Sequence, residues 1–362
     1  MNSPLNPSTM RVCHISFSFL IGGIENMVVD ILNEQSKTID THLVIVNDTY
    51  NQEIIDRISA KVHVHFINRP QGNPNPFYIF KLWYLLFKLR VQVIHCHSPK
   101  LIMFLLPFKN KCIYTVHNIG ISLKNLNRYK KLFAISHAVK EDLSKRGNLK
   151  SELVYNGIHF DRFEKRSDYN LQHGEVFKIV QVSRLLHEQK GQDILIKALE
   201  ELRLQNHLPE VELHIIGDGP SEGYLSDLIA KHNLGNTITL TGPKDRSWIY
   251  SDLKNYHLLV QPSRFEGFGL TVLEAVAAGI PVVASDIDGP AEIVKNMPGA
   301  WLFENENVSQ LTKAIKEVIT HYQDDKIASM CLNDIAEAKH KFSVVATAEN
   351  YLKHYQLINY NK

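Results

Sequence analysis

The chain has 362 residues, of which 44% are hydrophobic, so its length favours two globular domains and its composition excludes a disordered protein. Its 40 lysine and arginine residues nearly balance 38 aspartate and glutamate residues, and the net charge of +2 argues against a nucleic-acid-binding protein. No stretch has the length and the freedom from charge of a membrane-spanning helix, and the polar N-terminus lacks the apolar core of a signal peptide. We therefore expect a cytoplasmic protein.

The first part of the chain alternates apolar strand-like runs with amphipathic stretches. Because strands separated by helices pair in parallel, this pattern predicts an α/β sheet. Gly22 and Gly23 follow the first predicted strand, and they therefore lie at the edge of the sheet where such proteins bind ligands. We expect a helix at 24–35 and strands at 12–18, 42–46, 62–67, 91–96 and 112–116.

Residues 76–90 are apolar or aromatic nearly all round when they are drawn as a helix. Their charges are Lys81, Lys88 and Arg90. A helix of this kind packs by default in a protein core. Alternatively, its aromatic side chains insert into a membrane interface, with nearby cations facing anionic lipid. Further lysine and arginine residues that could add to such a surface are Lys109, Lys111, Lys124, Arg128, Lys130 and Lys131.

Cysteine and histidine residues give little support for a metal site. No two cysteines have the spacing of a metal-binding pair, and most lie in apolar runs, so buried free thiols are expected and a disulfide is the less favoured alternative. Zinc binding by His95, His97 and His117, which follow predicted strands, is conceivable. Without a cysteine pair or a His-Glu-x-x-His motif, however, we predict no metal.

The second part of the chain begins after a charged, polar stretch at 162–174, which is predicted to be a linker. A strand at 177–182 leads into a loop that carries Arg184 and Lys190, and a helix follows at 192–204. The two cations suit a diphosphate, because an arginine can fork two oxygen atoms and a lysine is a mobile point charge. A pair of solvent-exposed cations is the simpler alternative.

A strand-loop-helix-strand unit at 258–284 carries the strongest functional pattern. Glycines in its loop allow close approach of a ligand, and the N-terminus of the helix that begins near Leu270 favours a phosphate. Gly279 is placed to end this helix. Glu266 before the helix and Glu274 within it would repel a phosphate, so they must face hydroxyl groups. A nucleotide sugar offers both chemistries.

The Glu266-x7-Glu274 pattern, set in Ser-Arg-Phe-Glu-Gly-Phe-Gly-Leu, resembles the retaining family 4 glycosyltransferases of the GT-B fold, of the bacterial surface-polysaccharide type. The resemblance implies two Rossmann-like domains, at 1–160 and 161–341, with parallel sheets that face each other across a cleft. It implies a C-terminal helix at 342–362 that returns to the first domain. Ala134 to Val139 resembles the family's last strand and helix start in that domain, and Ser136 could cap this helix.

The resemblance also assigns roles to individual residues. Arg184 and Lys190 would stabilise the leaving diphosphate, and His117 would position the donor sugar. Glu266 would hold the sugar hydroxyls, and Glu274 would hold the ribose. The other residues expected to line the donor site are Gly22, Gly23, Gly217, Pro243, Gly267, Phe268, Gly269, Leu270 and Thr271.

The implied reaction is transfer of a sugar, with retained anomeric configuration, from a nucleotide diphosphate sugar, most simply a UDP-sugar. The acceptor would be a hydroxyl of a lipid-linked or polysaccharide substrate in lipopolysaccharide, capsule or exopolysaccharide biosynthesis. No cofactor or metal is expected. Contact with the inner face of the membrane through residues 77–87 is conceivable. A non-catalytic nucleotide-sugar binder and a glycosyltransferase with a soluble acceptor remain alternatives, whereas a phosphorylase lacks support because no pyridoxal phosphate lysine motif is visible.

Overall fold

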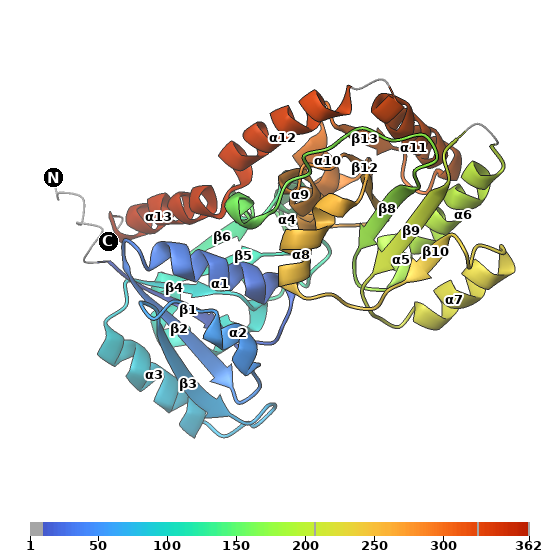
Figure 1. The fold of residues 1–362 in the computed structure, drawn as a ribbon. Coiled ribbons are helices and arrows are strands. Elements are labelled where there is room, and N and C mark those ends of the chain that lie inside the picture. The colour runs from blue at the N-terminus through green and yellow to red at the C-terminus, as the bar shows by residue number, and fades with distance from the viewer. Residues whose placement is uncertain (1–9, 206–207, 324–325, 361–362) are drawn as a thin grey trace. The chain divides into compact units, whose positions relative to one another are not determined.

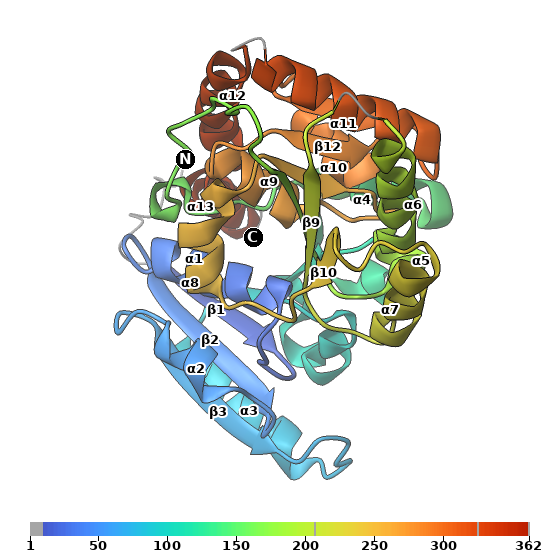
Figure 2. The same ribbon diagram turned by 45° about the vertical axis from the view of Figure 1, so that its right-hand side comes forward.

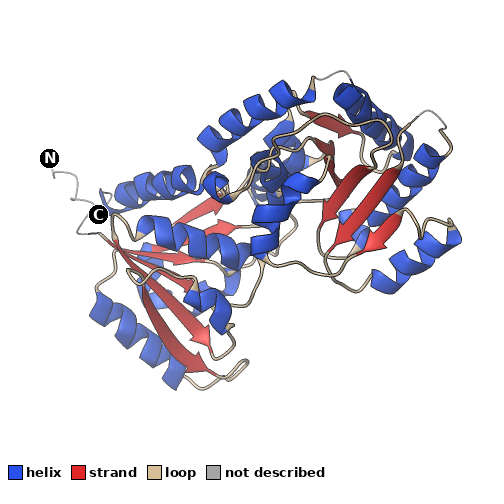
Figure 3. Cartoon of the chain, viewed as in Figure 1, coloured by secondary structure: helices blue, strands red, loops and turns tan. Residues whose placement is uncertain are grey.

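The computed structural model describes residues 10–205, 208–323 and 326–360. The chain forms two compact units, of which the first extends to Ile158 and resumes at Phe342, and the second runs from His159 to Lys341 (Figure 1). Each unit has a parallel sheet with helices around it (Figure 3). The predicted α/β class is therefore confirmed.

The sheet of the first unit has seven parallel strands in the order β3-β2-β1-β4-β5-β6-β7. Apart from Arg11 at the start of β1, the central strands are buried along their length, which explains their continuous apolar runs. The strand order reverses between β1 and β4, so a ligand-binding crevice is expected there. The bounds are β1 (Arg11–Ser16), β2 (Asp40–Asn47), β3 (His63–Arg69), β4 (Val93–Cys96), β5 (Cys112–Val116), β6 (Lys131–Ala134) and β7 (Ser151–Leu153).

Helices of the first unit lie on the sheet and beyond its β3 edge, where α3 packs along β3 (Figure 2). The C-terminal helix α13 packs beside α1 (Figure 1). Ser136 caps α4, as predicted, because its hydroxyl accepts a hydrogen bond from the Val139 N–H at 3.1 Å. The bounds are α1 (Gly23–Gln35), α2 (Gln52–Asp56), α3 (Phe77–Leu89), α4 (His137–Gly147) and α13 (Val344–Tyr360), with short turns η2 (Pro99–Phe104), η3 (Leu106–Lys111) and η4 (Leu126–Arg128).

The sheet of the second unit has six parallel strands in the order β10-β9-β8-β11-β12-β13, and its order reverses between β8 and β11. Gly279 has φ +74° and ends α9, as predicted. The strands are β8 (Phe177–Val182), β9 (Val211–Ile216), β10 (Ile238–Leu240), β11 (Leu258–Gln261), β12 (Val282–Ser285) and β13 (Ala300–Phe303). The helices are η5 (Phe160–Arg162), α5 (His187–Lys190), α6 (Gln192–Arg203), α7 (Glu222–Lys231), α8 (Arg246–Asp252), η6 (Leu253–Asn255), α9 (Leu270–Ala277), α10 (Asp288–Val294) and α11 (Val308–Gln323), and α12 (Ile327–Phe342) leads out of the unit.

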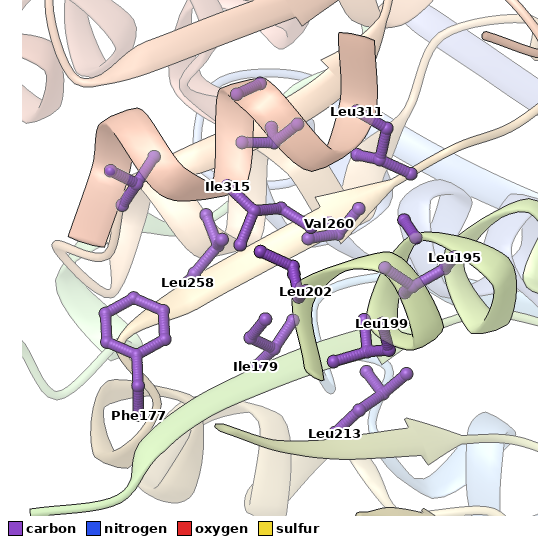
Figure 4. Packing of buried hydrophobic residues seen from close by; sticks show 14 of the residues in the cluster. Phe177, Ile179, Leu195, Leu199, Leu202, Leu213, Leu258, Val260, Leu311 and Ile315 are labelled. Atoms are coloured by element: carbon purple, nitrogen blue, oxygen red, sulfur yellow. The ribbon is translucent and has the colours of Figure 1, made fainter. Parts of the chain in front are cut away.

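The core of the second unit lies between its sheet and two helices that pack on each other, α6 and α11 (Figure 4). Leu195 and Leu199 of α6 and Ile315 of α11 are each at most 1% exposed, against Ile179 and Leu258 of the strands. Burying each of these side chains contributes roughly 2 kcal/mol. This core fixes β8 and β11 and therefore the loops that follow them.

The stretch at 162–174 is not a free linker, because Phe163 and Tyr169 are buried and the Tyr169 hydroxyl donates a 2.6 Å hydrogen bond to the Gly279 carbonyl.

All four cysteines are buried free thiols, as predicted. Across residues 10–205, 208–323 and 326–360, every helix falls short of the length and apolar character that crossing a bilayer requires.

Candidate active site

The loops after β8 and β11 meet at the carboxyl edge of the second sheet, where the strand order reverses. Lys190 ends the short helix α5 in the first of these loops, and Glu266 lies in the second. Their side chains form an ion pair, and each is 16% exposed. The structure therefore brings together a predicted cation and a predicted acid that are 76 residues apart in sequence.

Arg264 joins the same two loops. Its guanidinium donates two 2.9 Å hydrogen bonds to the two carboxylate oxygens of Asp193, and its backbone N–H donates to the Gln189 carbonyl at 2.8 Å. Burial would raise the pKa of Asp193, but the hydrogen bonds from Arg264 hold that pKa below its usual range. This bidentate pair fixes the approach of Lys190 to Glu266. Sequence reasoning missed Arg264, although it stands two residues before Glu266.

Gly191 permits the close approach of the two loops. It has φ +66°, and a Cβ atom at this position would lie 1.9 Å from the Pro262 carbonyl oxygen. The side-chain amide of Gln181, on β8, donates a hydrogen bond to the Lys190 carbonyl at 3.0 Å. Backbone geometry therefore requires glycine directly after Lys190.

Arg184 is exposed in the loop after β8, next to the loop after β9. Gly217 has φ +138°, and a Cβ atom there would lie 1.9 Å from the Ser183 carbonyl oxygen. The Gly217 N–H in turn donates to the Gly242 carbonyl at 3.0 Å, and the exposed Pro243 follows. The predicted residues Arg184, Gly217 and Pro243 thus lie in three adjacent loops at one sheet edge.

The N-terminus of α9 completes this edge. Gly269 precedes the helix with φ +98°, a backbone conformation that glycine adopts readily. The Thr271 hydroxyl donates to the Gln261 side chain at 3.1 Å and ties the helix to β11. Gly267 and Phe268 are buried, whereas Leu270, Thr271 and Glu274 are half-buried. The first N–H groups of α9 provide partial positive charge at the same edge as Lys190.

His117, the remaining predicted catalytic residue, belongs to the first unit. It is 7% exposed, and its two ring nitrogens have no hydrogen-bond partner among the described residues. Burial lowers the pKa of His117 to about 4. The ring stacks on that of His97, with centroids 5.8 Å apart. His117 is thus held neutral, and its position beside the donor sugar stays a prediction.

Three other histidines of this unit form a network in which His14 and His95 are buried and His97 is half-buried. One ring nitrogen of each of His14, His95 and His97 lies within 4.8 Å of the others, an arrangement that could hold a metal ion. However, both nitrogens of His14 face His97 and Gln35, at 2.9 and 2.8 Å. Those of His95 face Tyr355 and Thr115, at 2.6 and 2.7 Å. The network is therefore built from hydrogen bonds of neutral imidazoles, and burial lowers the pKa of His14 to about 4.

The metal alternative weighed from sequence named His117 in place of His14. Parallel pairing places His14 of β1 beside His95 of β4. No sequence spacing between these two residues indicates this, because the contact depends on the strand order.

A cavity of about 350 Å³ opens where β1 and β4 end. Ser16, Ser18, Glu25 and His97 are among its lining residues. Gly22 is the N-cap residue of α1, and a Cβ atom at this position would lie 2.6 Å from a carboxylate oxygen of Glu25. A Cβ atom at Gly23 would face open space. Burial raises the pKa of Glu25. Sequence reasoning assigned no role to this carboxylate, although it lies two residues after Gly23.

Two sequence families match consecutive parts of the chain. The family described as Glycosyltransferase Family 4 matches residues 21–162, and the family described as Glycosyl transferases group 1 matches residues 161–330. An uncharacterised glycosyltransferase of Methanocaldococcus jannaschii is 30% identical over 53% of this chain and 50% of its own length. The first curated relatives are matched over 33% to 50% of their length.

Other likenesses extend over nearly the whole chain. N-acetylgalactosamine-N,N'-diacetylbacillosaminyl-diphospho-undecaprenol 4-alpha-N-acetylgalactosaminyltransferase of Campylobacter jejuni is 24% identical, over 93% of this chain and 97% of that protein. A glycosyltransferase of Rickettsia africae has a TM-score of 0.81 at 19% identity, with 98% and 100% coverage. HepE of Anabaena, solved with UDP and glucose, has a TM-score of 0.77 at 21% identity, with 95% and 99% coverage. Both structural likenesses show a shared fold.

Proposed function

The chain belongs to the GT-B glycosyltransferases, and from this premise we propose that it transfers a sugar from a UDP-sugar to an acceptor hydroxyl with retained anomeric configuration. The observation that carries the proposal is the Lys190–Glu266 ion pair at the switch point of the second sheet, beside the N-terminus of α9. A cation, a carboxylate and the N-terminus of a helix at one sheet edge suit a sugar diphosphate.

Lys190 and Arg184 are proposed to neutralise the diphosphate. As the bond between the sugar and the diphosphate breaks, negative charge grows on the leaving group, and each fixed cation lowers the barrier by roughly 3 kcal/mol. The N–H groups near Gly269 to Thr271 are proposed to cap the phosphate nearer the sugar. This set of positive groups needs no metal ion.

Glu266 is proposed to bind hydroxyls of the donor sugar, and Glu274 is proposed to bind the ribose. The diphosphate competes with Glu266 for the Lys190 ammonium. When the diphosphate replaces Glu266 at the Lys190 ammonium, the Glu266 carboxylate becomes free to accept hydrogen bonds from the sugar. His117 is proposed to position the donor sugar.

In the transfer step, the anomeric carbon loses its bond to the diphosphate oxygen and gains one to the acceptor oxygen on the same face. The acceptor proton passes to the leaving phosphate. The cavity at the ends of β1 and β4 is proposed to hold the acceptor, with the Glu25 carboxylate accepting a hydrogen bond from one of its hydroxyls.

A UDP donor is supported by the fold shared with HepE, which was solved with UDP and glucose. A lipid-linked acceptor is supported by the Campylobacter jejuni relative, whose name specifies a diphospho-undecaprenol substrate. We accordingly propose a role in lipopolysaccharide, capsule or exopolysaccharide biosynthesis, at the cytoplasmic face of the membrane, with α3 turned toward the lipid.

The test measures hydrolysis of a panel of labelled nucleotide sugars, chosen by the thermal shift that each produces. We expect Lys190→Ala and Glu266→Ala each to lower the hydrolysis rate at least about 100-fold, by loss of roughly 3 kcal/mol of transition-state stabilisation. Lys254→Ala and Glu164→Ala break a second ion pair of the same unit and serve as matched controls. If the wild type binds a donor but neither it nor any variant hydrolyses that donor, the protein is instead a nucleotide-sugar binder.

A further inference from the structure

Although the net charge is close to zero, basic and acidic residues are distributed unevenly along the chain. From Arg57 to Lys140 the sequence contains fourteen lysine and arginine residues and no aspartate or glutamate. The rest of the chain holds all 38 acidic residues and the other 26 basic residues, so it carries a net charge of −12. The acid-free segment includes β3, α3, β4, β5 and β6 of the first unit. Such a field favours an anionic partner.

Four of these cations line one cavity of about 930 Å³, formed by residues before β5 and before β6. They are Lys109, Lys111, Arg128 and Lys130. Two are held in place, because the Lys111 ammonium donates to the Val91 carbonyl at 2.7 Å and that of Lys130 donates to the Ile358 carbonyl at 2.8 Å. Lys109 and Arg128 are exposed at this cavity.

Exposed apolar side chains continue from α3 toward the cavity. Leu82 and Leu86 bury one face of α3, whereas the opposite face exposes four aromatic side chains by 60% to 77%, so α3 is not a core helix. These are Phe77, Phe80, Tyr84 and Phe87. The Trp83 indole N–H donates to the Phe104 carbonyl at 2.7 Å, which joins α3 to the η2 turn. Beyond it, Met103 is 43% exposed and Leu106, which lines the cavity, is 44% exposed.

We propose that this cavity binds the phosphate headgroup of an anionic membrane lipid, while the aromatic face of α3 enters the interface beside it. Cations attract the headgroup, and amphipathic ring side chains occupy the boundary between water and hydrocarbon. RNA is less well matched, because aliphatic Met103 and Leu106 join the aromatic residues in one apolar surface. The inference rests on the proposed function only for its biological setting.

The lipid bound here is an anchor and not the acceptor. The basic cavity lies at the amino ends of β5 and β6, whereas the smaller cavity with Glu25 and His97 lies at the carboxyl ends of β1 and β4. A five-residue strand such as β5 separates the two edges of the sheet by about 16 Å. A headgroup phosphate therefore cannot occupy both cavities.

The experiment is flotation of the full-length protein with vesicles of phosphatidylcholine, with or without phosphatidylglycerol. Lys109→Gln/Arg128→Gln removes two cations from the cavity. Lys124→Gln/Lys140→Gln removes two cations from segments that follow the carboxyl ends of β5 and β6, and it is the matched control. We expect binding to anionic vesicles only, about 30-fold weaker for the cavity variant and changed less than about threefold for the control, at about fivefold per interfacial cation. Phe80→Ser/Phe87→Ser should also weaken binding without changing the melting temperature.

Several outcomes would overturn the inference. Equal losses for the cavity variant and the control would indicate diffuse attraction without a site. A thermal shift with glycerol phosphate, lost in the cavity variant while vesicles stay unbound, would indicate a site for a small soluble anion. Displacement from vesicles by RNA at equal phosphate concentration would indicate a nucleic-acid surface. Donor hydrolysis by the cavity variant should equal that of the wild type, so failure of the proposed sugar transfer would appear separately, as no hydrolysis by either protein.

Discussion

At the scale of single residues, the candidate donor site depends on ion pairs of two kinds. The Lys190–Glu266 pair is available to a ligand that offers both an anion and hydroxyl groups. The Arg264–Asp193 pair is structural, since Asp193 is 6% exposed and receives two hydrogen bonds from one guanidinium. A buried, bidentate pair of this kind is costly to break from one side, because the remaining charge is left without a partner.

Arg264→Gln should therefore lower the free energy of unfolding by about 3 kcal/mol. It should also raise the KM for the donor, because the loop that carries Lys190 loses its connection to the loop that carries Glu266. Urea unfolding and donor hydrolysis measure the two effects. Asp193→Asn added to Arg264→Gln should recover part of the stability, and a double variant as unstable as the sum of the single variants would contradict this account.

The buried histidines predict a dependence of stability on pH. Burial lowers the pKa of His14 and His117 to about 4, whereas an unfolded histidine has a pKa of about 6.5. The unfolded state therefore binds more protons between these values. Stability should be complete above pH about 6.5 and should fall as the pH decreases toward 4, by about 1.4 kcal/mol per pH unit for each histidine. Denaturant midpoints measured from pH 7 to 5 test this. His117→Gln should reduce the slope of stability against pH by about 1.4 kcal/mol per pH unit, which corresponds to one proton. An unchanged slope would contradict the lowered pKa of His117.

At the scale of elements, the site is made by loops at the carboxyl ends of β8, β9, β10 and β11, and their spacing is set by glycines that allow backbone atoms to touch. Gly191 against Pro262 and Gly217 against Ser183 are the closest approaches, each at 1.9 Å from a Cβ atom to a carbonyl oxygen. At both positions φ is positive, so a side chain would be strained even without the steric conflict.

Gly191→Ala should therefore separate the loops after β8 and β11. We expect a loss of at least about 2 kcal/mol in the free energy of unfolding, from left-handed backbone strain together with the steric conflict. The thermal shift produced by the donor should also decrease. Gly223→Ala in α7, where a Cβ atom would meet nothing within 4 Å, is the matched control and should leave stability unchanged or raise it by up to about 1 kcal/mol. Equal effects of the two substitutions would refute this role of Gly191.

At the scale of the whole molecule, residues 10–158 and 342–360 belong to the same unit. Helix α13 joins the first unit through Tyr351 and Tyr355, which are at most 1% exposed and whose hydroxyls bond to Thr115 and His95. The C-terminal segment is thus part of the histidine network beneath the proposed acceptor cavity.

Tyr355→Phe should lower the stability of the protein by roughly 1–3 kcal/mol, because a buried nitrogen of His95 loses its partner. Chemical denaturation measures this loss. Leu357→Ala, on the same helix but at a side chain that is 55% exposed, should change stability by less than about 0.5 kcal/mol. Similar values for both variants would show that the hydroxyl network contributes little.

Catalysis should not require a divalent metal ion. The proposed donor site opposes the diphosphate with Arg184, Lys190 and the N-terminus of α9, which together supply the positive charge that a metal ion would supply elsewhere. Donor hydrolysis should therefore be unchanged after dialysis against excess EDTA. A loss of activity that magnesium or manganese restores would refute this part of the mechanism.

Sequence alone determined the α/β class and the local unit at 258–284, because the strand, the glycine loop, the helix and the following strand are contiguous and each carries its own signal. It also singled out Lys190 and Glu266. Only the tertiary structure decided which distant residues meet: Arg264 with Asp193, His14 with His95, and the cations before β5 with those before β6. Strand order and packing fix these contacts, and neither is encoded in the spacing of residues along the chain.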